Sequence, residues 1–384
     1  MKIIEVITDQ QKREFLDFPK RLYQNDPGYI IPLDKDIEQV FDEQKNKFFR
    51  HGACKRWLCV NEQGKTIGKV ASFYNKRYQQ KQPTGGIGFF DCINDTAVSR
   101  LLLDHCKQWL QAQGMEAMDG PINFGERDRW WGLLIEGFTE PLYGMNYNAP
   151  YYQHLFEDYG FEVYFYQLCF SRSVRAELSS SFRAAYHKIS STPGIRLERI
   201  TRKDLSRQAA AFTEVYNKAW ASHGQGKQLE EKVAQKMFRS MKPVLNEHIS
   251  FLVYENEKPI AMWINIPDLN QWFKYLKGKF SLWHKLKFLW IKATRKNKKF
   301  VGLVFGIVPE WQKKGVDGFL IWKGAEHLKK HTAFEDYEMQ WIGDFNPKMV
   351  SIAGALQTEV TRRLATYRYL FDRTVPFERH PFLN

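Results

Sequence analysis

The stretch VGLVFGIVPEWQKKGVDG, residues 301–318, decides the fold expected for this chain. Its apolar first part, 301–308, is typical of a buried strand, and Pro309 ends the run because proline cannot donate to a central ladder. A basic loop over 312–318 then leads into a helical pattern over 319–331. Backbone N–H groups converge at such a helix start, where the helix dipole also favours negative charge. The segment therefore predicts an anion site.

Lys313 and Lys314 add positive charge to the predicted anion site. The alternative interpretation is that Gly315 and Gly318 only shape a turn. The order of strand, proline, glutamine, basic pair, glycines and helix favours binding of a phosphate group.

Bulk composition is that of a folded protein without a membrane span. The chain has 384 residues, 43% of them hydrophobic and 15% aromatic, which is enough for two domains with real cores. The opening MKIIEVITDQ lacks the features of a signal peptide, and no apolar run approaches the ~18 residues of a membrane helix. The five cysteines are scattered without a CxxC pair, which argues against a disulfide framework or a zinc ribbon. We therefore expect a cytoplasmic protein without a metal site.

Positive charge is concentrated in one segment. The net charge is +14, and residues 271–300 hold ten lysines and arginines without a single acid. Within 281–293, apolar side chains form a stripe on one helical face, and Phe288 and Ile291 face away from that stripe. The stripe consists of Leu282, Trp283, Leu286, Leu289, Trp290 and Ala293.

The basic segment 271–300 has three interpretations. It is an interfacial helix on an anionic membrane surface, a helical insertion whose lysines are solvated, or a contact for RNA. The first interpretation makes the protein peripheral to a membrane, and nucleic acid is the least favoured of these partners. The sequence predicts no particular oligomeric state.

The same order of elements occurs twice along the chain. WLCVNEQGKTIGKVASF and FLVYENEKPIAMWI each give strand, polar turn and strand, and each hairpin precedes a further strand and a helix. We interpret this order as one duplicated αβ unit, the alternative being two unrelated mixed domains. The predicted domains are 1–171 and 194–384, joined by a linker over 172–193, with a basic aromatic insertion at 270–299.

Hydrophobic periodicity and turn residues predict the individual elements. In the first half, strands are expected over 57–61, 66–74, 86–92, 116–120 and 161–170, and helices over 9–24, 96–113 and 151–158. In the second half, strands are expected over 195–200, 249–254, 259–266, 301–308 and 337–342, and helices over 203–220, 319–331 and 347–356.

The second half resembles the GNAT superfamily of acyl-CoA-dependent N-acyltransferases. The resemblance implies an α/β fold with a mixed sheet, as two GNAT-like domains in tandem. It is carried by a hairpin, the coenzyme loop and an asparagine after the next strand: Val308, Pro309, Gln312, Gly315, Gly318 and Asn346.

The first half resembles the same fold less closely. The matching residues are Asn146, Tyr151, Tyr152 and the triplet 159–161, but the loop 93–96 has no comparable glycine pattern. We therefore expect this copy to be degenerate and not to bind CoA. The run MDGPINFGERDRWWGLLIEGF, residues 118–138, resembles an uncharacterised bacterial group of tandem GNAT proteins.

The resemblance implies acetyl-CoA or a longer acyl-CoA as co-substrate. Ile307 and Val308 would pair with the pantetheine arm, and Asn346 would lie near the thioester sulfur. Asp317 departs from the family, which usually has glycine or alanine there, and its carboxylate disfavours pyrophosphate unless it points outward. The expected pyrophosphate cradle is formed by the backbone of Gln312, Lys313, Lys314, Gly315, Val316, Asp317 and Gly318.

Acyl transfer to an amine requires a base, an oxyanion donor and an acid for the leaving thiolate. The candidate bases are Glu338, on the strand beside the coenzyme strand, and Asp344, in the loop before Asn346. The alternative for Glu338 is a solvated carboxylate on the face of a strand. The family's usual acid is a tyrosine on the last helix, and 347–356 contains none. Two alternatives follow: water donates the proton, or the site is impaired.

A charged aromatic loop in the first half is a candidate for substrate recognition, because arginines bind carboxylates through two hydrogen bonds and indoles stack on rings or cations. The alternative is a structural loop whose tryptophans, Trp130 and Trp131, belong to the core. The candidate substrate residues are Glu126, Arg127, Asp128, Arg129, Trp130 and Tyr151.

The leading functional hypothesis is an acyl-CoA-dependent N-acyltransferase acting on a small amine. The alternatives are a peptidyltransferase that uses aminoacyl-tRNA and a non-catalytic acyl-CoA or lipid-binding protein. The net charge of +14 suits tRNA. The missing tyrosine and Asp317 favour the non-catalytic protein, whereas the coenzyme loop favours the transferase.

Overall fold

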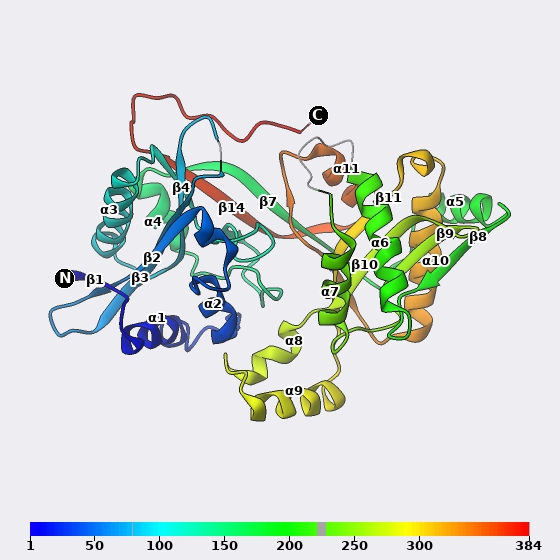
Figure 1. The fold of residues 1–384 in the computed structure, drawn as a ribbon, viewed down its shortest axis with the longest axis horizontal. Coiled ribbons are helices and arrows are strands. Elements are labelled where there is room, and N and C mark those ends of the chain that lie inside the picture. Colours follow the sequence, from blue (N-terminus) through cyan, green and yellow to red (C-terminus); the bar gives the residue numbers. More distant parts are fainter. Residues whose placement is uncertain (79, 221–227, 384) are drawn as a thin grey trace.

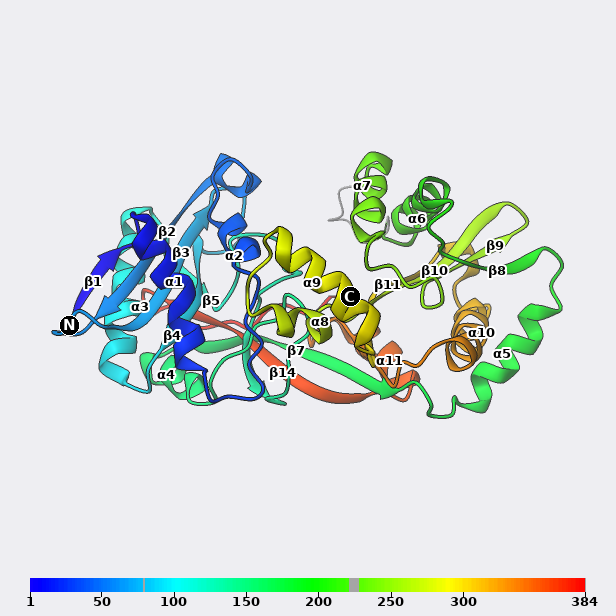
Figure 2. The ribbon, with the colours of Figure 1, turned by 90° about the horizontal axis from the view of Figure 1, so that it is seen from below.

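The computed structural model describes residues 1–78, 80–220 and 228–383. Within them the strands form one long mixed sheet of 14 strands, and helices pack on both of its faces (Figures 1 and 2). The strands are β1 (Lys2–Glu5), β2 (Gly52–Val60), β3 (Thr66–Asn75), β4 (Thr84–Cys92), β5 (Ala117–Gly120), β6 (Leu133–Glu136), β7 (Glu162–Ser173), β8 (Ile195–Arg199), β9 (Phe251–Glu255), β10 (Lys258–Pro267), β11 (Lys299–Ile307), β12 (Asp336–Met339), β13 (Ile342–Gly343) and β14 (Glu359–Leu370).

The helices agree closely with those expected from periodicity, because capping residues mark their ends. Asp95, for example, accepts hydrogen bonds from the first turn of α3, and Gly114 follows that helix with a φ of 78°. The α-helices are α1 (Asp9–Leu22), α2 (Asp34–Val40), α3 (Thr96–Ala112), α4 (Tyr152–Tyr159), α5 (Ser180–Ser190), α6 (Leu205–Trp220), α7 (Glu231–Met241), α8 (Asn270–Phe273), α9 (Leu282–Thr294), α10 (Val316–His331) and α11 (Pro347–Ala355).

Two long strands at the centre of the sheet belong to opposite ends of the chain. The strand order is β1-β2-β3-β4-β5-β14-β7-β12-β11-β10-β9-β8, so β14 lies between two strands of the first half. In turn, β7 of the first half pairs with β12 of the second half. Figure 1 shows β7 and β14 running side by side from one half into the other. The sequence did not predict β14, and its pairing makes the sheet continuous.

The segment 172–193 is more ordered than a plain linker. β7 extends to Ser173, and α5 packs along α10, where a Cβ on Gly318 would lie 2.4 Å from the Cβ of Ala185. The division of the chain at 1–171, 172–193 and 194–384 stays a prediction. β7 and β14 are exchanged strands, since each pairs with a strand of the other half, and they join both halves in one sheet.

A buried ion pair holds β14 against β5. Arg368 donates to both carboxylate oxygens of Asp119, at 2.7 and 2.8 Å, and these side chains are 5% and 2% exposed. On the same strand, Arg363 pairs with Glu136 at 3.0 Å, but those side chains are 38% and 57% exposed. The two pairs therefore differ mainly in burial.

We predict that Arg368→Leu lowers the free energy of unfolding by about 3–5 kcal/mol, because it leaves Asp119 buried without its cation. The matched control Arg363→Leu is expected to cost less than about 1 kcal/mol, since exposed pairs contribute little. Urea unfolding followed by circular dichroism measures both. Equal effects of the two substitutions would contradict the burial of β14 beside β5.

Candidate functional site

A bulge in β11 opens the edge of the strand toward β12. Asn265 of β10 pairs with Gly302 and Ile264 pairs with Val304, so Leu303 is an extra residue without a partner. A bulge bends its strand and interrupts the ladder. β12 follows β11 only from Lys299 to Gly302, and among the described residues no strand pairs with 303–307 on that side. The result is an unpaired strand edge in the second half.

The first half contains the same bulge in its corresponding strand. Lys69 of β3 pairs with Asp91 and Ala71 pairs with Gly88, which leaves one extra residue in β4. Phe89 at this point has a φ of 49°, a value that is uncommon for a residue with a side chain. The bulged strands of the two halves therefore correspond.

Two tyrosines at the start of α4 contact the open edge in the first half. Beyond the bulge of β4, the N–H of Cys92 donates to the hydroxyl of Tyr152 at 2.8 Å, and the hydroxyl of Tyr151 donates to the carbonyl of Cys92 at 2.7 Å. Before the bulge the two halves are alike, because the N–H of Ile122 donates to the carbonyl of Ile87 at 2.7 Å and the N–H of Gln340 donates to the carbonyl of Gly302 at 3.1 Å. The halves therefore differ beyond the bulge.

A helix N-terminus without a side-chain cap lies at the end of the open edge. α10 begins after Gly315, whose φ is 98°, and no side chain accepts from its first N–H groups. The side-chain amide of Gln312 donates to the carbonyl of Ile307 at 3.0 Å and so ties the loop to β11. Lys313 and Lys314 are exposed beside it. This geometry suits an anion.

Asp317 and Gly318 of the predicted cradle each have a structural role that does not involve a ligand. The side chain of Asp317 is exposed in the first turn of α10, a position where the helix dipole stabilises a carboxylate. Gly318 is buried against α5, so close packing of two helices requires a glycine there. Val316 is buried in the core of the second half, and Val308 joins it. A contact of 312–318 with a ligand stays a prediction.

An apolar groove with a free volume of about 50 Å³ lies beside the open edge, between α10 and α11. Because the bulge adds one residue, Phe305 returns to the sheet face that Phe300 occupies before it. The groove continues along α10 and ends near the loop after β7. Its lining includes Phe305, Ile321, Leu328, Met339, Met349 and Ile352.

The hydroxyl of Tyr337 lies at the bulge. A Cβ on Gly302 would be 2.3 Å from the hydroxyl oxygen, and the indole N–H of Trp263 donates to that oxygen at 3.3 Å. Burial raises the pKa of Tyr337 to about 12, so the hydroxyl keeps its proton at neutral pH. Tyr337 was not predicted from the sequence, because the family's usual acid is a tyrosine on the last helix. A tyrosine on the strand facing Gly302 was the available signal.

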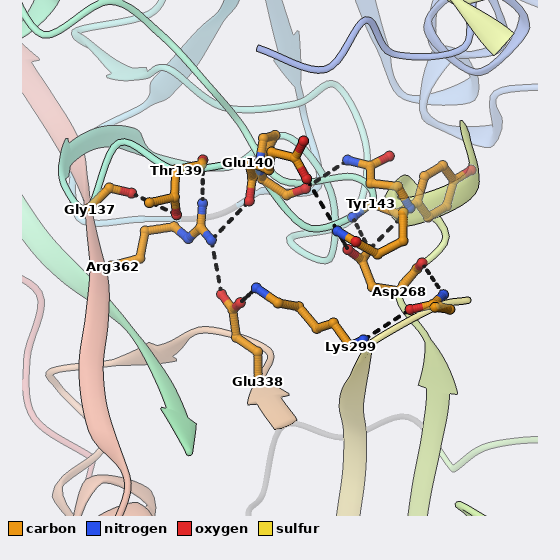
Figure 3. A network of polar contacts seen from close by, with 12 residues as sticks. Gly137, Thr139, Glu140, Tyr143, Asp268, Lys299, Glu338 and Arg362 are labelled. Carbon is orange, nitrogen blue, oxygen red and sulfur yellow. Dashed lines mark hydrogen bonds and ion pairs between the residues drawn. The ribbon is translucent and has the colours of Figure 1, made fainter. Parts of the chain in front are cut away.

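Glu338 is buried on the opposite face of β12, within a network of ion pairs (Figure 3). Its carboxylate lies 2.9 Å from the ammonium of Lys299 and 3.3 Å from the guanidinium of Arg362. Arg362 also donates to the carbonyls of Thr139 and Glu140 at 3.0 and 3.1 Å. Glu338 is therefore not the solvated carboxylate of the alternative interpretation, because two cations face it in the interior.

The network extends to a second buried carboxylate at the end of β10. Asp268 accepts from the backbone N–H groups of Asn270 and Tyr143, at 3.1 and 3.2 Å. Burial nevertheless raises the pKa of Asp268 to about 6, since desolvation outweighs these hydrogen bonds. Glu140 pairs with Lys274 at 2.9 Å, which links the first half to the insertion 270–299.

Asp344 and Asn346 have structural partners. Asp344 accepts the backbone N–H of Tyr166 at 3.1 Å and an arginine hydrogen bond from Arg379 at 2.6 Å. Asn346 is the N-cap of α11, where its side chain accepts the N–H of Met349 at 3.2 Å. Neither contact excludes a catalytic role, and both roles stay predictions.

The predicted substrate residues do not gather at one place. Trp130 is buried and lines a cavity of about 90 Å³ in the first half, together with Lys69, Asp91 and Tyr152. The remaining loop residues contact other parts of the first half, and Tyr151 donates to the carbonyl of Cys92 at 2.7 Å. The partners of that loop are Lys47 for Glu126, Tyr78 for Arg127, Arg129 for Asp128, and Tyr143 for Arg129.

Comparison with solved structures shows which proteins share this fold. A tandem GNAT protein from the clavulanic acid biosynthesis pathway, without acetyl-CoA, superposes with a TM-score of 0.54 at 10% identity. The match covers 98% of this chain and 99% of that one. A GCN5-related glucosamine N-acetyltransferase region of a fungal multi-domain GH3 β-N-acetylglucosaminidase also gives 0.54 at 11% identity, over 96% of this chain and 38% of that one. This chain has the fold of a tandem GNAT, acyltransferase-like protein.

Two curated proteins are distant relatives over nearly the whole length. The bacterial ceramide synthase of Caulobacter vibrioides (strain NA1000 / CB15N) is 22% identical over 362 residues, 92% of this chain and 93% of the relative. Protein YghO of Escherichia coli (strain K12) is 23% identical over 363 residues, 92% of each. No protein-family model matches the chain.

We predict that Asp268 lowers stability as the pH rises from about 4 to 6. In this window the folded state holds a proton that the unfolded state, with a pKa of ~3.9, has lost. In Asp268→Asn, the side-chain oxygen keeps both N–H bonds and the titration disappears. The variant is therefore expected to gain about 3 kcal/mol over the wild type between pH 4 and 7. Urea unfolding at several pH values measures the difference, with exposed Asp128→Asn as control. Parallel pH curves for the wild type and Asp268→Asn would contradict the assignment.

Proposed function

We propose that the chain is an acyl-CoA-dependent N-acyltransferase whose site lies in the second half, between β11 and β12. The observation that carries the proposal is the open edge 303–307, which ends at the uncapped N-terminus of α10. An acyl-CoA has an arm with two amides, able to pair with a strand edge, and a pyrophosphate that suits a helix N-terminus. The tandem GNAT fold supports this proposal.

The residues present fit such a co-substrate. The backbone of Ile307 and Val308 continues the open edge, and exposed Lys313 and Lys314 supply positive charge where the pyrophosphate would lie. Asp317 does not oppose binding, because its side chain is exposed to solvent. In the first half the hydroxyls of Tyr151 and Tyr152 bond to the backbone of Cys92 on the equivalent edge, which supports the proposal that this copy is degenerate and binds no CoA.

We further propose a long-chain acyl group. The groove between α10 and α11 has a mostly apolar lining, and its free volume of about 50 Å³ is smaller than a long alkyl chain, so an acyl chain would have to part the side chains that line it. It begins at Phe305, beside the bulge where the thioester would lie. An alkyl chain in this groove would be removed from water, which stabilises binding in proportion to its apolar area.

The acceptor we propose is a primary amine on an amphipathic molecule. A ceramide is the amide of a long-chain amino alcohol, and a ceramide synthase from Caulobacter vibrioides is 22% identical to this chain. The similarity supports an amide product with two alkyl chains. The particular amine is not specified by this level of identity.

Tyr337 and Glu338 are suited to the proton transfers. As consecutive strand residues they point to opposite faces of β12, so one lies on each side of the gap. The amine nitrogen forms the bond to the acyl carbon as the carbon–sulfur bond breaks. A backbone N–H of the open edge stabilises the oxyanion, and Tyr337 gives its proton to the departing sulfur and takes up the remaining excess proton of the nitrogen.

Glu338 is the candidate base for the ammonium proton, acting through water. One of its oxygens accepts from Lys299, and the other lies 3.3 Å from the guanidinium of Arg362. A water molecule that bridges the ammonium to Glu338 would share this second oxygen with Arg362. Asp344 remains a second candidate base, and Asn346 a candidate neighbour of the sulfur.

We predict that the wild type binds palmitoyl-CoA with a Kd near micromolar, about −8 kcal/mol, and binds acetyl-CoA more weakly because the groove stays empty. Lys313→Glu with Lys314→Glu is expected to weaken binding by about tenfold or more, since four units of charge change beside the pyrophosphate. Lys2→Glu with Lys65→Glu is the control of equal charge at exposed positions in the first half. Isothermal titration with acetyl-CoA, palmitoyl-CoA and free CoA measures all three proteins. If none of the ligands binds the wild type, the proposed site is wrong.

We predict that Tyr337→Phe reduces kcat by about 10²-fold and leaves palmitoyl-CoA affinity unchanged, because only the proton donor is lost. Tyr186→Phe is a matched control, since its ring stacks on Phe319 of α10 at 5.9 Å, away from the bulge. Release of free thiol during acylation of a long-chain amine measures the rate. Unchanged turnover in Tyr337→Phe would show that water, and not Tyr337, donates the proton to the departing sulfur. Tight acyl-CoA binding without turnover of any amine would instead indicate a non-catalytic binding protein.

A further inference from the structure

The insertion between β10 and β11 places an amphipathic helix at the surface with its apolar stripe outward. The inner side of α9 packs through Phe288 and Ile291, 6% and 1% exposed, in a cluster with Trp272, Phe273 and Leu276. Figures 1 and 2 show α8 and α9 projecting from one side of the sheet, between the two halves. The helix is therefore held in place by one face, and its other face is free within the described structure.

The outward face carries large apolar side chains at helical spacing. Leu282 is 75% exposed, Trp283 80%, Leu286 53%, Leu289 56% and Trp290 60%. A contiguous patch of this kind on a protein surface marks an interaction site, because water would otherwise contact all of it. Within the described residues, no helix is both long and apolar enough to cross a membrane. A helix of this kind instead lies in the plane of an interface.

The charges around this stripe identify the partner. Residues 271–300 contain no acid, and exposed Lys279, Lys285, Arg295 and Lys296 lie on or beside α9. A second copy of the chain would bring like charges together across the interface, which disfavours self-association. An anionic lipid surface is complementary to both the cations and the apolar stripe.

A basic groove adjoins the C-terminal end of α9. It has a free volume of about 600 Å³, and its lining includes Arg202, His248, Lys292, Arg295, Lys296 and His331. Glu247 is its acid, and Arg202 already pairs with it at 3.3 Å. A groove with this excess of positive charge suits the phosphate groups of lipid headgroups.

We infer that α9 and the basic groove form a docking surface for membranes that contain anionic phospholipid. Trp283 and Trp290 enter the interfacial region, and the surrounding cations contact headgroup phosphates. The inference is independent of the proposed transferase activity, because docking requires no acyl-CoA.

Co-sedimentation with phosphatidylcholine vesicles, with and without phosphatidylglycerol, tests this surface. We expect the wild type to bind the anionic vesicles, with binding that weakens as salt rises. Trp283→Gln with Trp290→Gln should weaken binding by about tenfold or more, because the inserted rings are lost. Lys279→Gln, Lys285→Gln and Lys296→Gln together should reduce the dependence on phosphatidylglycerol. Val233→Gln with Met237→Gln is the control, since these side chains on α7 are 47% and 44% exposed.

Three results would overturn the inference. The first is a wild type that ignores anionic vesicles at low salt. The second is a wild-type dimer, seen by light scattering, that the two tryptophan substitutions convert to monomer, which would make the stripe a self-association surface. The third is binding to bulk tRNA that competes with vesicles and is lost in the lysine variant but kept in the tryptophan variant. That result would assign the surface to nucleic acid.

Discussion

The pairing of β7 with β14 is the constraint on which the rest of the structure depends. These two twelve-residue strands form the middle of the sheet, and each is paired on its outer side with a strand of the other half. The arrangement is stabilised by buried contacts that span the chain, such as the ion pair of Arg368 with Asp119 and the hydrogen bonds of Arg362 to the carbonyls of Thr139 and Glu140. Because buried charges are tolerated only with their partners, these contacts also specify the register of the exchanged strand.

The two halves use the same distortion with different outcomes. A bulge bends β4 in the first half and β11 in the second, and the parallel neighbour follows each strand only as far as the bulge. In the first half two tyrosine hydroxyls bond to the backbone of Cys92 beyond the bulge, so these backbone groups are satisfied internally. In the second half a helix N-terminus, an apolar groove and two protonatable side chains surround the edge. The two halves thus differ in the space that they leave for a ligand beside the bulged strand.

Local signals in the sequence predicted most elements, and non-local contacts explain what they missed. The hairpins, the capped helices and the loop after β11 were predicted because turn residues and periodicity act over a few residues. β14 was missed because Arg362 and Arg368 suggest an exposed segment, and their partners lie far away in sequence. Tyr337 was missed for the same reason, since its role depends on Gly302 across the sheet. Glu338 was found as a strand residue, but its burial between two cations was not predictable.

The exchange of β14 has a consequence for synthesis of the protein. Asp119 of β5 forms its ion pair with Arg368, which is 249 residues further along the chain. While the polypeptide grows, the first half exposes an unpaired edge of β5 until almost all of the second half has been made. Contacts between residues so far apart in sequence form slowly, and exposed strand edges can pair with other chains. Misassembly and chaperone binding are therefore most expected during synthesis, after the first half has been made and before β14 has been added.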